Sequence, residues 1–248
     1  MPFERAFATV AERVEHLNET WKNHAAIPTL QWILQDPNVG RVAMVSSFGA
    51  ESVVLLHMVS LINPDLPILF IDTEMLFEET LEYQREVAET LGLSDIRVIR
   101  ADRAAVKKAD PFGRLHLAQP DQCCRLRKTL PLQRALTDFD LWITGRKRFQ
   151  GAARETLDLF ENESYLRIKI NPLAHWRRAD LQDYIINNRL PQHPLVAQGY
   201  PSIGCAPTVC TRKVATGNDP RAGRWAGRNK TECGIHFGLD GQPQRSAS

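Results

Sequence analysis

Five cysteines are the residues of this 248-residue chain whose spacing points most directly to chemistry. Cys123 and Cys124 are adjacent, and Cys205 and Cys210 form a C-x4-C pair later in the chain. Four thiols in two close pairs can complete a tetrahedral zinc site or hold an iron–sulfur cluster, and the spacing leaves both open. Cysteines that only fill the core are the remaining interpretation. Because adjacent cysteines rarely arise from packing alone, we favour a metal site.

The fifth cysteine, Cys233, lies apart from these pairs in the segment KTECGIH near the end of the chain. Positive neighbours lower the pKa of a thiol and make it a better nucleophile, and Arg228, Lys230 and His236 would act in this way. Glu232 would oppose them. The alternative is an exposed thiol without a function.

The segment SSFGAES (46–52) lies between a predicted strand and a predicted helix. In an open parallel sheet this junction is where ligands bind, and the helix that follows adds its positive N-terminal dipole. Ser46, Ser47 and Gly49 can offer hydroxyl and N–H groups to an anion. The alternative is an ordinary tight turn with a glycine.

Basic residues gather in three segments. A run of charges is by default a solvated surface, and RNA binding is a second interpretation. Few aromatic residues interleave with these basic residues, so a small, multiply charged anion gripped by guanidinium groups suits them better. The segments contain Arg125, Arg127 and Lys128; Arg146, Lys147, Arg148 and Arg154; and Arg221, Arg224, Arg228 and Lys230.

Strand patterns alternate with helix patterns through most of the chain. This alternation predicts right-handed crossovers and a mainly parallel sheet. Pro131 interrupts the helix pattern at 125–137, or alternatively starts a new segment there. The strands are predicted at 41–47, 67–72, 96–100 and 141–144, and the helices at 3–24, 28–36, 51–62, 77–93, 125–137 and 179–188.

The predicted fold class is therefore α/β, an open and mainly parallel sheet flanked by helices. After about residue 190 the chain is rich in Pro and Gly and has no sustained period. We expect an α/β domain with N-terminal helices at 1–190, and an irregular C-terminal arm at 191–248 that carries Cys205, Cys210 and Cys233. The final GLDGQPQRSAS is predicted to be disordered.

The composition excludes several classes of protein. The net charge of +2 gives no broad basic field for nucleic acid, and no apolar run is long enough to span a membrane. The first residues lack the apolar core and cleavage site of a secretion signal. We expect a cytoplasmic protein with reduced thiols, in which an odd number of cysteines argues against a disulfide framework.

Two motifs resemble the adenine nucleotide alpha-hydrolase-like superfamily. SSFGAES resembles its PP-loop, and IDTEMLFEET (71–80) resembles its second signature, with Glu74 in place of the usual glycine. The resemblance implies that 1–190 is a nucleotide-binding domain with a phosphate-binding loop, and that Asp72 and Thr73 lie near a ribose or phosphate.

Four further segments make the resemblance specific to the assimilatory adenylyl-sulfate reductase family. They are CCRLRKTLPL (123–132), GCAPTVCTRKV (204–214), DPRAGRW (219–225) and KTECGIH (230–236). In that family the tandem cysteines and a C-x2-C pair hold one [4Fe–4S] cluster, so the resemblance implies a cluster on Cys123, Cys124, Cys205 and Cys210. In this chain Thr208 and Val209 lengthen the pair to C-x4-C.

The resemblance also implies roles for single residues. Cys233 would be the nucleophile, and Lys128 would lie between cluster and sulfate. The other expected substrate-binding residues are Ser46, Ser47, Gly49, Glu51, Ser52, Asp72, Thr73, Lys147, Arg148, Gln150, Arg154, Arg221, Arg224 and His236.

The implied reaction reduces adenylyl sulfate to sulfite and AMP through an S-sulfocysteine. Because the chain has no spare cysteine to release sulfite, thioredoxin or glutaredoxin is the implied partner and supplies the electrons. The sequence leaves open a homo-oligomer. Alternatives are a reductase for the 3′-phosphorylated substrate, a PP-loop ATP pyrophosphatase, and a noncatalytic zinc or iron–sulfur protein that binds RNA.

Overall fold

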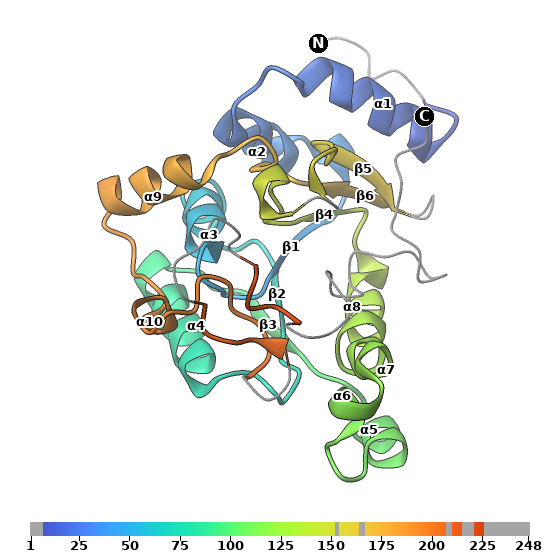
Figure 1. Cartoon of the computed structure of the whole chain (residues 1–248). Coiled ribbons are helices and arrows are strands. Elements are labelled where there is room, and N and C mark those ends of the chain that lie inside the picture. Colours follow the sequence, from blue (N-terminus) through green and yellow to red (C-terminus); the bar gives the residue numbers. More distant parts are fainter. Residues whose placement is uncertain (1–6, 152–153, 164–166, 207–209, 215–220, 226–248) are drawn as a thin grey trace.

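The structure, a computed structural model of the chain, describes residues 7–151, 154–163, 167–206, 210–214 and 221–225. At its centre is one sheet with the strand order β3-β2-β1-β4-β6-β5 (Figure 1). All neighbouring strands run parallel except β5 and β6, which are antiparallel. The strands are β1 (Val42–Ser46), β2 (Ile68–Ile71), β3 (Ile96–Ile99), β4 (Leu141–Ile143), β5 (Phe160–Glu163) and β6 (Arg167–Ile170).

The predicted α/β class is confirmed, and the four predicted strands correspond to β1–β4. Strands β5 and β6 were not predicted. Their sequences, FENE and RIKI, contain charged residues, so they lack the apolar runs of the inner strands. Lys169 on β6 is nevertheless fully buried.

Five helices share the main core on one face of the sheet. Buried apolar side chains from these helices pack with those of β1, β2, β4 and β6. Each of the five overlaps a predicted helix, with bounds that differ by a few residues. They are α1 (Val10–Trp21), α2 (Ala26–Gln35), α3 (Ser52–Ser60), α4 (Glu78–Leu91) and α9 (Arg178–Asn187).

The other face of the sheet is covered by α8 (Leu130–Ala135) and the 3₁₀ turn η3 (Leu136–Asp138). Leu132 and Leu136 pack there against Trp142 of β4, which is fully buried. Two further 3₁₀ turns flank strands of the sheet. The turn η1 (Pro37–Val39) precedes β1, and η4 (Arg148–Gln150) follows β4.

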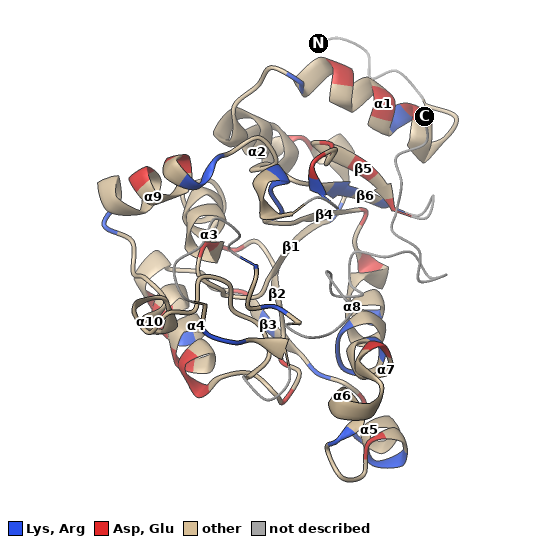
Figure 2. Cartoon of the chain, in the orientation of Figure 1, with Lys and Arg blue, Asp and Glu red and all other residues tan. Residues whose placement is uncertain are grey.

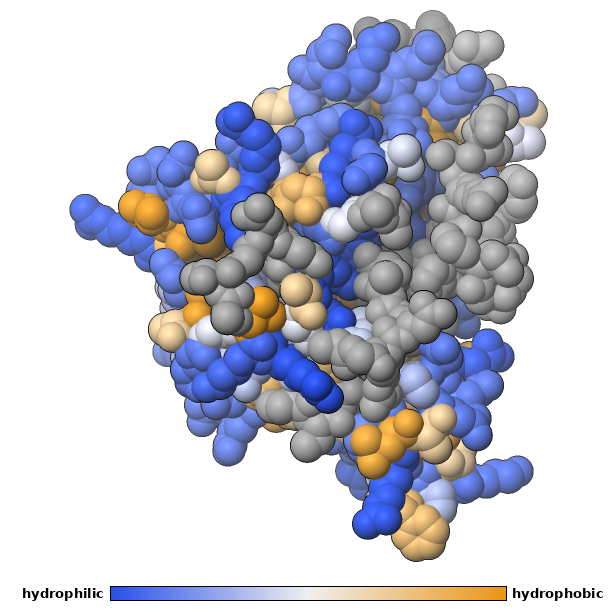
Figure 3. All heavy atoms as spheres, viewed as in Figure 1, coloured by the Kyte–Doolittle hydropathy of each residue, from blue (hydrophilic) through white to orange (hydrophobic). Residues whose placement is uncertain are grey.

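A run of short helices leads into α8. It consists of α5 (Arg103–Ala109), α6 (Leu115–Ala118), α7 (Pro120–Cys124) and the π-helical turn η2 (Arg125–Thr129). The alternative that Pro131 starts a new segment is confirmed, because this proline lies in the first turn of α8, where no intrahelical N–H donor is needed. The N–H of Leu130 instead closes the wider turn on the carbonyl of Arg125. Figure 3 shows apolar surface over α5 and α6, where Phe112 and Leu117 are exposed.

Within its described residues, the C-terminal arm is irregular apart from α10 (Pro194–Ala197) and isolated bridges. Tyr200 and Ile203 pack on Phe77 at the start of α4. Cys205 forms an antiparallel bridge with Leu76, in the loop after β2. These contacts place the described part of the arm at the carboxyl end of the sheet. The division into two domains stays a prediction. Among the described residues, no helix has the length and apolar character needed to cross a membrane.

Candidate active site

A cavity of about 220 Å³ lies where strands β1, β2 and β4 end. Its lining combines the loop after β1, the start of α3, the segment after β4, and residues 201–204 of the arm. Figure 2 shows Lys and Arg on several of the segments that meet at the centre of that view. Twelve residues expected to bind substrate line this cavity: Ser46, Ser47, Gly49, Glu51, Ser52, Thr73, Lys128, Lys147, Gln150, Arg154, Arg221 and Arg224.

The loop after β1 is held by its own hydrogen bonds. The N–H of Phe48 donates to Ser46 Oγ at 3.2 Å, and the N–H of Gly49 donates to Ser52 Oγ at 3.0 Å. Phe48 has a φ of 46° and a fully buried ring that packs edge-on against Phe70. The expected free N–H of Gly49 is therefore occupied within the loop, and the strained backbone is held by a packed side chain.

Glu51 stands at the N-cap position of α3 and connects the loop to the segment after β4. Its Oε2 accepts hydrogen bonds from Lys147 Nζ at 2.7 Å and from Gln150 Nε2 at 2.9 Å. Arg154 Nη1 in turn donates to Gln150 Oε1 at 2.5 Å. Burial lowers the pKa of Lys147, and the adjacent Glu51 opposes that shift.

Two of the predicted substrate-binding residues do not line the cavity. Arg148 Nε donates to the carbonyl of Leu157 at 2.8 Å. Asp72 is buried and accepts from Arg100 Nε at 2.8 Å and from the N–H of Glu74 at 2.8 Å. Both side chains support neighbouring loops in this structure, and their predicted contacts with substrate remain untested.

The Asp72 contact also explains how Glu74 can stand where the second signature usually has glycine. Glu74 has a φ of 58°, in the left-handed region that favours glycine. The Asp72 carboxylate holds the backbone N–H of this turn, and the Glu74 carboxylate reaches Arg127 Nη1 at 3.2 Å. The turn of the second signature is thus kept without the glycine.

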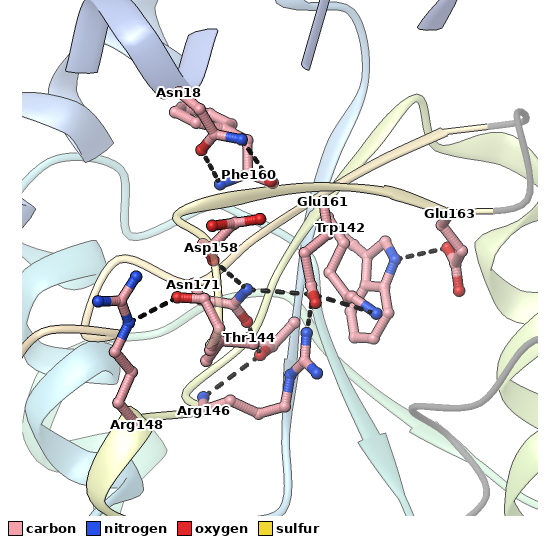
Figure 4. A network of polar contacts seen from close by, with 12 residues as sticks. Asn18, Trp142, Thr144, Arg146, Arg148, Asp158, Phe160, Glu161, Glu163 and Asn171 are labelled. Atoms are coloured by element: carbon pink, nitrogen blue, oxygen red, sulfur yellow. Dashed lines mark hydrogen bonds and ion pairs between the residues drawn. The ribbon is translucent and has the colours of Figure 1, made fainter. Parts of the chain in front are cut away.

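Arg146 was placed in a basic segment by the sequence but was not predicted to bind substrate, and yet it lines the cavity. Its guanidinium makes an ion pair with Glu161 of β5 (Figure 4). Lys169 Nζ lies 3.3 Å from the same carboxylate, and Asn171 Nδ2 donates to it at 3.2 Å. The signal that could have revealed this network is the charged character of β5 and β6.

Lys169 is the most deeply buried cation of the network. Burial, followed by the nearby Arg146, lowers its pKa to about 7, while Glu163 opposes the shift. Its ammonium group also lies 5.4 Å from the centre of the Trp142 ring. Two buried cations therefore share Glu161 beneath the cavity.

The four paired cysteines lie together beside the cavity. Cys123 and Cys124 end α7, whereas Cys205 and Cys210 belong to the arm, and all four are buried. Cys123, Cys124 and Cys205 line one small cavity, and Cys124, Cys205 and Cys210 pack with Trp225. We call these four residues the cysteine cluster. As placed, no group of three or more His, Cys, Asp or Glu side chains within the described residues could hold a metal ion.

The pKa of two thiols in the cysteine cluster is raised, although basic neighbours oppose the shift. Burial raises the pKa of Cys123, while Arg127 and Lys128 pull it down. A hydrogen bond with Cys205, followed by burial, raises the pKa of Cys210, and Arg224 pulls it down. Arg224 Nη2 lies 3.7 Å from Cys210 Sγ. Four thiols with basic neighbours are a donor set suited to iron–sulfur or zinc.

Thr73 and Lys128 line both the large cavity and the small one next to the cysteines. Thr73 Oγ1 lies 3.4 Å from Cys205 Sγ. The two sites therefore share a wall. The predicted nucleophile Cys233 and the neighbouring Arg228, Lys230 and His236 lie outside the described residues.

Comparisons with known proteins identify the family of this chain. The profile described as the phosphoadenosine phosphosulfate reductase domain matches residues 41–213. A Mesorhizobium japonicum protein named adenosine 5'-phosphosulfate reductase is 51% identical over 196 residues, which are 79% of this chain and 76% of that protein. A Gloeobacter violaceus protein named phosphoadenosine 5'-phosphosulfate reductase is 36% identical over 225 residues, covering 90% and 93% of the two chains.

The same fold occurs in a solved structure. The crystal structure of phosphoadenylyl-sulfate (PAPS) reductase from Candida auris, as a phosphate complex, has a TM-score of 0.67 and 27% identity. The match covers 81% of this chain and 98% of that chain. The domain profile spans all six strands and part of the arm, and the chain belongs to the phosphoadenosine phosphosulfate reductase domain family.

Proposed function

We propose that this protein reduces adenylyl sulfate to sulfite and AMP, as the name of its Mesorhizobium japonicum relative suggests. The observation that carries the proposal is the shared wall formed by Thr73 and Lys128 between a basic cavity and the cysteine cluster. A nucleotide-sized anion in the cavity would have its charged end within reach of Lys128.

The proposed nucleophile is Cys233. Its thiolate attacks the sulfur of the sulfate group, and the bond from that sulfur to the phosphate oxygen breaks. AMP leaves with the electron pair, and the enzyme keeps an S-sulfocysteine. A second thiolate then attacks the Cys233 sulfur and expels sulfite.

The electrons come from an external dithiol protein, for which thioredoxin or glutaredoxin is the proposed class. Its first thiol forms a mixed disulfide with Cys233, and its second thiol resolves that disulfide. The donor ends as a disulfide, which accounts for the two electrons that convert sulfate sulfur into sulfite. The chain's other four cysteines are buried in the cysteine cluster, so they are poorly placed to act as the resolving thiol.

We further propose that the cysteine cluster holds one [4Fe–4S] cluster. The support is the burial of four thiols from α7 and the arm, together with the basic groups Arg127, Lys128 and Arg224. When bound, the cluster would supply a fixed cross-link and a local charge next to Lys128. Lys128 would then orient the sulfate end of the substrate, with Arg221 and Arg224 beside it in the cavity.

The 3′-phosphorylated substrate defines a second candidate function. The observation that favours it is the relative from Gloeobacter violaceus, which is named for that substrate and covers nearly the whole chain. Steady-state rates of sulfite release with each sulfonucleotide and reduced thioredoxin, without ATP and magnesium, separate the two functions. Failure to release sulfite from either nucleotide would exclude both.

The nucleophile is tested with Cys233→Ser. This variant should lose sulfite release and keep its iron and sulfide content. Wild-type protein incubated with adenylyl sulfate and no dithiol should gain about 80 Da on the peptide that contains Cys233, the mass of a bound SO₃ group. An active serine variant, or an adduct on another cysteine, would contradict the assignment.

A further inference from the structure

Glu51 differs in charge from the cavity in which it lies. Among the described residues that line the cavity, it is the only acidic one. Six basic residues share the lining: Lys128, Arg146, Lys147, Arg154, Arg221 and Arg224. A carboxylate is unexpected in a cavity proposed to bind an anionic substrate, because it would repel that substrate.

The Glu51 carboxylate occupies the donors that a phosphate would use. One of its oxygens takes both the Lys147 ammonium and the Gln150 amide, at 2.7 and 2.9 Å. Its side chain retains 21% exposure, whereas that of Lys147 retains 3%. Both residues line the cavity, and the Glu51 carboxylate is the more exposed of the pair.

The positive charge of Arg146, the residue before Lys147, is also neutralised by a carboxylate of the protein. Arg146 pairs with Glu161, which also takes Lys169. Two basic residues after β4 are therefore matched by carboxylates of the protein. Less uncompensated positive charge is therefore left at these two residues for an anionic ligand.

Sulfonucleotides differ in how strongly this arrangement would affect them. An added phosphate brings about 1.5 to 2 further negative charges and needs its own donors. Lys147 and Gln150 already donate to the Glu51 carboxylate, so an added phosphate beside them would meet a negative charge and would lack these two donors. Placing like charges together is an effective way to suppress a wrong ligand.

We propose that Glu51 is a specificity-determining residue that selects adenylyl sulfate against sulfonucleotides carrying an additional phosphate. This inference rests on the proposed function. Glu51 acts as an internal anion: it neutralises Lys147, occupies Gln150 and repels a second phosphate on the nucleotide.

The test is the substitution Glu51→Gln, which keeps an oxygen acceptor for Lys147 and Gln150 and removes the charge. The ratio of kcat/KM for adenylyl sulfate to that for its 3′-phosphorylated form should fall at least about tenfold. The ratio of Kd for adenosine 3′,5′-bisphosphate to that for AMP should fall in parallel, in a titration that needs neither the nucleophile nor the dithiol.

A second variant reverses the sign. Gln150→Glu adds a negative charge beside Glu51 and should move both ratios in the opposite direction. Glu78→Gln, an exposed carboxylate in the first turn of α4 that does not line the cavity, is the matched control and should leave both ratios unchanged.

The outcomes separate this inference from the function it rests on. Wild-type protein that releases sulfite from neither nucleotide removes the proposed function. Wild-type protein that prefers adenylyl sulfate, with both ratios unmoved in Glu51→Gln, leaves the function standing and overturns the role of Glu51. A wild-type preference for the 3′-phosphorylated substrate also overturns it.

Discussion

The cavity has two sides that are built in different ways. Its sheet side comes from β1, the start of α3 and the segment after β4. Two basic residues there pair with carboxylates, Lys147 with Glu51 and Arg146 with Glu161. Its cysteine side joins α7 to the arm, two segments far apart in the sequence. The sheet side is fixed by strand order and ion pairs, whereas the cysteine side depends on contacts between distant segments.

Because of this difference, we expect some substitutions to change mainly the folding free energy and others to change mainly metal content and activity. Changes in the core behind the sheet side should cost folding free energy and leave the thiols in place. Changes on the cysteine side should affect metal content and activity first. The expected effects below test this separation, beginning with the largest.

The largest expected effect is that of Cys210→Ser. If the cysteine cluster holds the proposed iron–sulfur group, this variant should lose most of its bound iron and its sulfite release. Iron and sulfide analysis with visible absorbance measures it, and Cys123→Ser should behave alike. Retention of full iron in Cys210→Ser would mean that the longer C-x4-C spacing brings another ligand into use.

The second expected effect concerns Arg127, which anchors the cysteine side. Arg127 bonds Asp110 at 3.1 Å and the carbonyl of Thr73 at 3.0 Å, and both charged side chains are nearly fully buried. Arg127→Gln would leave the Asp110 carboxylate buried without its charge partner. The free energy of unfolding should fall by about 3 to 5 kcal/mol in urea titrations.

The matched control for this change is Arg97→Gln. Arg97 pairs with Asp95 at 2.7 Å, but its side chain is 48% exposed. An exposed ion pair contributes at most about 1 kcal/mol. Equal losses in the two variants would argue against burial as the reason that Arg127 matters.

The third expected effect is in the core behind the sheet side. Leu56 of α3 is fully buried, and Leu56→Ala should lower the free energy of unfolding by about 2 to 5 kcal/mol through the cavity it leaves. Iron content at low temperature should stay at the wild-type level. Leu61→Ala, at a side chain that is 67% exposed, should change stability by less than about 0.5 kcal/mol. If Leu56→Ala remained folded but lost iron, the sheet side and the cysteine side would not be independent of each other.

The smallest expected effect is a pH dependence at His193, where the arm meets α4. His193 Nδ1 accepts the N–H of Leu195 at 3.2 Å, and Nε2 lies 3.0 Å from Thr80 Oγ1. Burial lowers its pKa to about 4, and Glu79 opposes the shift. The neutral ring is therefore the form that the fold prefers.

The sign of the effect follows from where the protons bind. Below pH 6.5 the unfolded chain protonates this histidine before the folded chain does, so stability is complete above that pH and falls as the pH drops toward 4. Between pH 7 and 5 the loss through His193 should be about 2 kcal/mol. Unfolding titrations of wild type and His193→Gln at both pH values measure it, and equal slopes would contradict the assignment.

Much of the sheet side could be predicted from the sequence. Short apolar runs ending in Ser, Gly or Asp identified β1 and β2, and amphipathic spacing identified α1 and α4, because burial imposes a local period on such elements. Strands β5 and β6 escaped this reasoning, since Lys169 is buried through a partner on β5. A buried cation is intelligible only once its carboxylate is known.

The residues at the cavity divide in the same way. Loop motifs located Ser46, Ser47, Gly49, Glu51 and Ser52, and twelve of the predicted residues do line one cavity. The sequence alone could not tell that Arg148 turns to the carbonyl of Leu157, or that Arg146 faces the cavity. Neighbouring side chains in an irregular turn point in directions that only the folded backbone sets.

The amino-acid sequence by itself determined the class of fold, the phosphate-loop position and the two pairs of cysteines, because each depends on residue types and spacings within short segments. Only the tertiary structure decided that α7 and the arm meet, that Lys128 borders both cavities, and that Glu51 pairs with Lys147 at the cavity wall. These facts come from contacts between residues far apart in the chain, whose geometry is set when the whole core packs.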